Sequence, residues 1–188
     1  MKRMVIFASG SGSNMQRIAE YFMDDETIEI AAVVCNKPDA GVIVRAEKFN
    51  IPVVMIDRNS FYKSEELTKR LQNFRTDLII LAGFLWLIPD YLLQAFPNSI
   101  INIHPALLPK YGGKGMYGMK VHEAVIKARE KKSGITIHLV NENYDEGRIL
   151  FQQSIDLDPD ETPHSLAGRI HQLEHEYFPM VIKQYLLG

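Results

Sequence analysis

The stretch MVIFASGSGSNMQRIAEYF, residues 4–22, joins a short apolar run to a glycine-rich turn and then to a segment with helical periodicity. The run from Met4 to Ala8 is predicted to form a buried strand, and Asn14 to Phe22 a helix. A strand that leads directly into a helix opens a crossover unit, in which the next strand lies parallel to the first. This stretch therefore predicts an α/β fold.

The same alternation continues along the chain. Six more runs are predicted strands: Ile28 to Cys35, Pro52 to Ile56, Leu78 to Ala82, Ile100 to Ile103, Ile135 to Leu139 and Ile149 to Ile155. Four more helices are expected between strands: Gly41 to Phe49, Lys63 to Phe74, Pro89 to Ala95 and Val121 to Lys131. Most connections are therefore expected to be crossovers.

The carboxyl-terminal part of the chain follows a different pattern. Only Val140 to Arg148 separate the last two predicted strands, which is too short for a crossover and indicates an antiparallel strand at the sheet's edge. A final helix is expected after Thr162, whose hydroxyl can cap it ahead of Pro163. The predicted fold is a doubly wound, mostly parallel seven-stranded sheet, in a single domain covering residues 1–188.

The amino-acid composition indicates which class of ligand the protein binds. The chain has 188 residues, 46% of them hydrophobic, which suits one substantial core. A net charge of −2 offers no general attraction to nucleic acid or an anionic membrane, so small-molecule ligands are expected. The apolar run after Lys2 and Arg3 is too short for a signal peptide, and Cys35 has no other cysteine to pair with. These features favour a cytoplasmic protein.

The glycine-rich turn is a candidate anion site. Gly10, Ser11, Gly12, Ser13 and Asn14 follow the first strand, and the next helix offers free N–H groups there. A dinucleotide fingerprint is incomplete, because the third glycine is missing and Cys35-Asn36-Lys37 stands where a ribose-binding acid belongs. A purely structural tight turn remains the alternative, and a bound phosphate monoester is the preferred interpretation.

Asn102 and His104 end a buried-type strand two positions apart, so their side chains are expected on the same face. An amide and an imidazolium aimed at one point can stabilise an oxyanion. Asp145, in the turn before the last strand, is a candidate carboxylate partner that would favour the protonated ring and relay a proton. A hydrogen-bonded core pair and an ordinary acidic turn residue are the structural alternatives.

Three motifs together resemble the glycinamide ribonucleotide formyltransferases: NIHPALLP at residues 102–109, GSGSN at 10–14 and YDEG at 144–147. The resemblance covers nearly the whole chain. It implies formyl transfer from 10-formyltetrahydrofolate to the amine of glycinamide ribonucleotide, in a cytoplasmic monomer or weak homodimer. By the same resemblance, Asn102, His104 and Asp145 are catalytic, Gly10 to Asn14 hold the substrate phosphate, and Glu174 lies on the ribose and amine side.

The resemblance also assigns a pterin-binding wall. This wall comprises Phe84, Leu85, Trp86, Leu87 and Ile88, together with Asn102. Without the family resemblance, the same apolar run would be interpreted as a core strand followed by the start of a helix. The resemblance further implies a cis Leu108–Pro109 bond. The chain departs from the family pattern at Ala106, Trp86 and Lys120, and in a lengthened loop at 112–118, which affects fine substrate contacts and leaves the catalytic trio intact.

Several rival functions remain open. Methionyl-tRNA formyltransferase and formyltetrahydrofolate hydrolase share the donor, but the former grips a polymeric acceptor and the latter has a second histidine in place of Pro105. The phosphate turn favours the ribonucleotide acceptor over both. His171-Gln172-Leu173-Glu174-His175 fits an inverted zinc motif, although no third ligand is evident downstream and no metal is expected. A nucleotide-sensing domain without catalysis is the remaining alternative.

Overall fold

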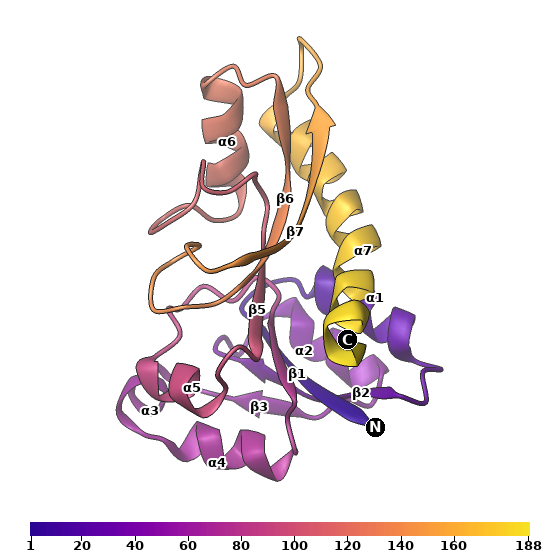
Figure 1. Cartoon of the computed structure of the whole chain (residues 1–188), viewed down its shortest axis with the longest axis vertical. Helices are drawn as coiled ribbons and strands as arrows, with labels where there is room; N and C mark the ends of the chain where they lie inside the picture. Colours follow the sequence, from indigo (N-terminus) through magenta and orange to yellow (C-terminus); the bar gives the residue numbers. More distant parts are fainter.

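The computed structural model describes all residues from Met1 to Gly188, and its centre is a seven-stranded sheet in the order β3-β2-β1-β4-β5-β6-β7 (Figure 1). The strands are β1 (Lys2–Ala8), β2 (Ile28–Cys35), β3 (Val53–Met55), β4 (Leu78–Leu81), β5 (Ile100–His104), β6 (Lys132–Leu139) and β7 (Ile149–Asp156). The helices are α1 (Ser13–Phe22), α2 (Gly41–Lys48), α3 (Arg58–Lys63), α4 (Glu66–Asn73), α5 (Asp90–Ala95), α6 (Met119–Lys127) and α7 (Pro163–Leu187). All seven predicted strands are present.

The first five strands are parallel, and of the last two only β6 runs in the opposite direction. β6 is antiparallel to β5 as well as to β7, so the expected crossover between β5 and β6 is wrong. His104 at the end of β5 pairs with Thr136, which leaves the first residues of β6 beyond the carboxyl end of β5. The segment containing α6 therefore stays at that end of the sheet and does not return along it.

Helices cover both faces of the sheet, which explains why the central strands read as continuous apolar runs. Alternate residues of β1 enter two cores, with Met4 and Ile6 in one and Val5 and Phe7 in the other. The first core is completed by α1, α2, α6 and α7, and the second by α3, α4 and α5. In Figure 1, α7 extends beside β6 and β7, far from α3 and α4.

Helix boundaries differ from the prediction where capping decides them. The expected helix from Lys63 to Phe74 is present but shorter, as α4, and it is preceded by α3, which was not predicted. Asp57 caps α3 by accepting from the backbone N–H groups of Asn59 at 2.8 Å and Ser60 at 3.0 Å. The Thr162 cap of α7 is confirmed, as a capping box with Ser165. None of the helices combines the length and apolarity that a membrane span requires.

Candidate active site

A cavity of about 620 Å³ lies at the carboxyl ends of β1, β4 and β5. Ligands of open α/β sheets gather at this edge, beside the point where the strand order reverses between β1 and β4. The loop 113–118, the hairpin between β6 and β7, and α7 also contribute to the wall. Every residue predicted to bind or transform a ligand lines this one cavity: Gly10, Ser11, Gly12, Ser13, Asn14, Phe84, Leu85, Trp86, Leu87, Ile88, Asn102, His104, Asp145 and Glu174.

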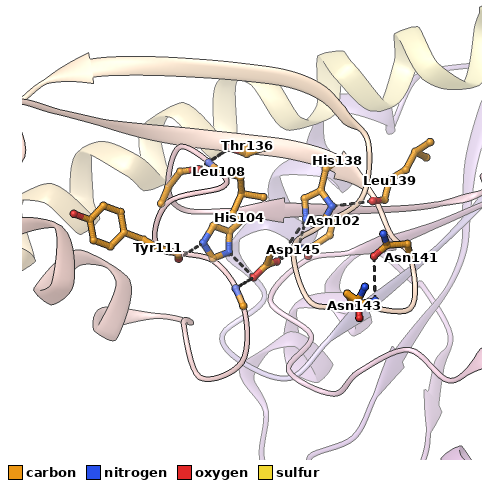
Figure 2. Close-up of polar contacts among 12 residues, drawn as sticks. Asn102, His104, Leu108, Tyr111, Thr136, His138, Leu139, Asn141, Asn143 and Asp145 are labelled. Atoms are coloured by element: carbon orange, nitrogen blue, oxygen red, sulfur yellow. Dashed lines mark hydrogen bonds and ion pairs between the residues drawn. The ribbon is translucent and has the colours of Figure 1, made fainter.

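The structure brings Asn102, His104 and Asp145 together (Figure 2). His104 Nδ1 lies 3.5 Å from Asp145 Oδ2, and the Asn102 amide nitrogen donates to Asp145 Oδ1 over 3.4 Å. Strand alternation places Asn102 and His104 on the same face of β5, and the β6–β7 hairpin carries Asp145 back over them. The predicted proximity of the three side chains is confirmed, while their catalytic roles stay predictions.

The surroundings of His104 act on its pKa in opposite directions. Burial lowers the pKa of His104, which is 4% exposed, and outweighs the opposing effects of the Asp145 carboxylate and the Tyr111 carbonyl. The Tyr111 oxygen lies 2.7 Å from His104 Nε2 and can only accept, so Nε2 carries a proton. The ring thus lies between two acceptors, with Nε2 donating to the Tyr111 carbonyl and Nδ1 facing the Asp145 carboxylate 3.5 Å away.

Sequence reasoning missed His138, which is buried beside the trio. Asn102 and His138 are opposite each other in the β5–β6 register, and the Asn102 amide nitrogen lies 3.1 Å from His138 Nε2. The Leu139 carbonyl oxygen lies 2.8 Å from His138 Nδ1, so Nδ1 donates there and Nε2 is left to accept from Asn102. The missed signal was the alternation of Thr136 and His138 within an otherwise apolar strand.

Asp145 is held in place by the backbone after the Asn-x-His strand. The N–H of Gly113 donates to Asp145 Oδ2 at 2.9 Å. Burial raises the pKa of Asp145, but contacts with His138, His104 and Gly113 outweigh it and leave the pKa below its ordinary value. Gly112 allows this approach, because a Cβ there would lie 2.5 Å from a Leu108 methyl and 3.2 Å from Asp145 Cβ. Asp145 is therefore an ionised carboxylate directed at His104.

The predicted phosphate turn lies in the same cavity, between β1 and α1. Gly12 has a φ of 80°, and a Cβ at this position would come within 2.6 Å of Val42 Cα, so the turn requires glycine here. The Asn14 amide donates to Glu174 Oε2 at 2.8 Å and links the turn to α7. Burial raises the pKa of Glu174, with the Asn14 hydrogen bond and His171 opposing this effect.

The predicted pterin wall divides into buried and accessible residues. Phe84 and Ile88 are 8% and 3% exposed and belong to the core beneath the cavity, as the structural alternative expected. Leu85, at 39%, is exposed, and Trp86 is half-buried against Phe84 and Phe61. The Leu108–Pro109 bond is cis, as the resemblance implied. Leu85 and Trp86 thus leave an accessible apolar surface on the cavity wall.

The inverted zinc motif on α7 does not gather its side chains at one point. Glu174 and His171 line the cavity, whereas His175 lines a separate surface hollow with Arg17 and Arg45. The structure contains no group of three His, Cys, Asp or Glu residues placed to hold a metal ion. Glu174 instead bonds to Asn14, which ties this motif to the turn.

Because His122, in the first part of α6, is buried, we expect the protein to lose stability in mild acid. It is 3% exposed, and burial, helped by His171 and His104, lowers its pKa to about 4. Because the unfolded chain binds this proton near pH 6.5, stability should fall as the pH drops from 6.5 towards 4, by roughly 3 kcal/mol for this group. Urea unfolding of His122→Asn should show a flatter pH dependence than the wild type. His164→Asn, at an exposed site, is the control, and identical pH slopes in all three proteins would contradict the assignment.

Comparisons with known proteins agree with this geometry. Residues 2–182 match a family described as formyl transferase. The chain is 40% identical to phosphoribosylglycinamide formyltransferase of Bacillus subtilis, covering 99% of this chain and 95% of that protein. It is 42% identical to the chloroplastic phosphoribosylglycinamide formyltransferase of Arabidopsis thaliana, covering 96% of this chain and 64% of the relative's length. The crystal structure of glycinamide ribonucleotide transformylase 1 from Geobacillus kaustophilus matches with a TM-score of 0.89 at 36% identity, covering 99% of both chains.

Proposed function

Because this chain belongs to the formyl transferase family, we propose that it transfers a formyl group from 10-formyltetrahydrofolate to the amine of glycinamide ribonucleotide. One observation carries the proposal: a single cavity holds both the Asn102, His104 and Asp145 cluster and the glycine-rich turn. The cluster suits attack of an amine on a carbonyl carbon. The turn suits a phosphate on the same acceptor.

The three clustered residues take complementary parts in the proposed reaction. The Asn102 N–H that makes the long 3.4 Å bond to Asp145 is the one available to the formyl oxygen as negative charge develops there. Asp145 accepts the proton that the amine loses as its bond to the formyl carbon forms, directly or through one water. That proton then moves to the donor nitrogen as the old carbon–nitrogen bond breaks, so Asp145 ends the cycle ionised.

His104 supports this sequence from its position between the Tyr111 carbonyl and Asp145. Its Nε2–H is held by the Tyr111 carbonyl, which orients the ring and leaves Nδ1 beside Asp145. A proton that reaches Asp145 can be shared with Nδ1, and the resulting imidazolium is stabilised by the carboxylate and the carbonyl on its two sides. The charged ring then adds to the stabilisation of the oxyanion.

The wall formed by Leu85, Trp86 and Leu87 is the proposed site of the donor. All three line the cavity and are at least partly exposed, and Trp86 is backed by Phe61 and Phe84. The bicyclic ring of the donor can therefore lie against an apolar surface that is packed from behind. When bound, the folate supplies the formyl carbon, and this wall and Asn102 are proposed to set its position relative to His104.

A comparison of formyl acceptors tests the proposed substrate. Purified protein supplied with 10-formyltetrahydrofolate is expected to formylate glycinamide ribonucleotide, with kcat/KM at least about 10³-fold above that for methionyl-tRNA, because the cavity has one phosphate turn and no extended basic surface. Water as acceptor should be slower still. Product formation is followed by the absorbance of released tetrahydrofolate and by mass spectrometry of the formylated acceptor.

Each alternative outcome identifies a different enzyme. Donor consumption that is independent of any amine would indicate a hydrolase, and preferential labelling of methionyl-tRNA would indicate a tRNA formyltransferase. Either result overturns the proposed acceptor. The glycinamide ribonucleoside lacking its phosphate is the matched control, and it should react with a much higher KM because the turn has no anion to bind.

A further inference from the structure

The back of the phosphate turn, on the side away from the cavity, is fastened by α1 and α2. Three consecutive carbonyl oxygens are each bonded there: Gly10 O accepts from the Val42 N–H at 3.1 Å, Ser11 O from Arg45 Nε at 2.9 Å, and Gly12 O from the Gln16 N–H at 2.9 Å. Gly41 fits closely behind them, since a Cβ on it would lie 3.0 Å from Ser11 O. Two of the three donors are backbone groups, and only Arg45 is a side chain.

These bonds decide where the turn's N–H groups point. In a planar trans peptide the C=O and N–H bonds point in opposite directions. The bonded carbonyls therefore direct the N–H groups of Ser11 and Gly12 away from α2, and that of Ser13 away from the body of α1. All three of these residues line the cavity. No backbone carbonyl accepts a hydrogen bond from residues 10 to 14. The result is a row of donors suited to a phosphate.

We infer that Arg45 is a positioning residue for the substrate phosphate, although it lies outside the catalytic cavity. Its Nε holds the Ser11 carbonyl, which fixes the peptide whose N–H belongs to Gly12. Its Nη1 also bonds to the Gln16 side chain, so the planar guanidinium joins the turn to the first turn of α1. Without Arg45, the 11–12 peptide loses its back-side donor and can rotate its N–H out of the phosphate site.

Arg17 offers a matched control in the same hollow. Arg45 and Arg17 line the same surface hollow behind the turn. Arg17, whose side chain is 49% exposed, makes an i,i+3 ion pair with Glu20 at 3.3 Å and no bond to the turn. The two arginines therefore carry equal charge at similar places, and only one fixes a peptide of the anion site. Comparing them separates positioning from a general electrostatic contribution.

The identity of the substrate in this inference rests on the proposed function, so the test also includes a binding measurement that does not depend on catalysis. Arg45→Met is expected to raise KM for glycinamide ribonucleotide by about tenfold or more while kcat changes by about twofold or less. The Kd of ribose 5-phosphate, measured by calorimetry without the folate, should rise by the same factor. KM for 10-formyltetrahydrofolate and all constants of Arg17→Met should match the wild type.

Each outcome either supports or rejects the role of Arg45. Arg45→Lys keeps the positive charge but cannot bond to the Ser11 carbonyl and the Gln16 side chain at once, so KM and Kd should rise less than in Arg45→Met. The lysine variant also provides the test if Arg45→Met does not fold. Unchanged KM and Kd in the Arg45 variants, or equal effects in Arg17→Met, would reject positioning by Arg45. Failure of the wild type to bind ribose 5-phosphate would reject it too. A wild type that binds this ligand but does not formylate the ribonucleotide refutes only the proposed function.

Discussion

His104→Ala is expected to lower kcat for formyl transfer by a factor of about 10² or more, with a smaller change in the KM of either substrate. The ring is 4% exposed, and it lies between the Tyr111 carbonyl at 2.7 Å and the Asp145 carboxylate at 3.5 Å. Its removal leaves Asp145 without a neighbour that can share a proton, and it removes the charge of the imidazolium from beside the oxyanion. Steady-state kinetics at saturating concentrations of both substrates measures the effect.

Folding must be separated from catalysis in this variant, because the ring is buried. Far-ultraviolet circular dichroism and an unchanged Kd for ribose 5-phosphate would show that the fold and the phosphate turn remain intact. The exposed His164→Ala is the control for loss of a histidine in general. Turnover close to that of the wild type in a folded His104→Ala protein would reject the catalytic assignment of His104.

Asp145→Asn is expected to lower kcat by a factor of roughly 10² to 10⁴, the range associated with loss of a proton-transfer group. The amide has the same shape and can still accept from the Gly113 N–H, now 2.9 Å from Oδ2, so the hairpin should keep its position. It cannot accept the proton that the attacking amine loses. The pKa of His104 should fall further, because the carboxylate that raises it has been removed.

Two measurements together distinguish this role from a structural one. Nuclear magnetic resonance titration of the His104 ring should give a lower pKa in Asp145→Asn than in the wild type, and kinetics should show the loss of kcat. Glu146→Gln, at the exposed neighbouring position of the same turn, is the control and should leave both quantities unchanged. A titration curve identical to the wild type would contradict direct coupling between Asp145 and His104.

Much of the site could be predicted from the sequence because it follows local patterns of residues. Alternation along a strand has a period of two, which places Asn102 and His104 on one face in any sheet that contains this strand. A glycine-rich turn between a strand and a helix must lie at the carboxyl edge of a parallel sheet. The same alternation could have identified His138, but its strand was treated only as apolar.

Chain direction was harder to predict, because it depends on packing between distant segments. A helix between two strands is compatible with a parallel or an antiparallel pair, and β5 and β6 form the antiparallel one, with α6 packed against the first core. Short helices such as α3 depend on a single cap and have little periodicity of their own. These are the places where the predicted and observed elements differ.

The strands, the glycine-rich turn and the shared face of Asn102 and His104 were predictable from the sequence, because each follows from neighbouring residues and backbone geometry. Folding of distant segments brings Asp145 to His104, buries this ring so that its pKa is lowered, and places Arg45 behind the turn. Distances, solvent exposure and the direction of a peptide group depend on segments that only folding brings together, so spacing along the chain does not encode them.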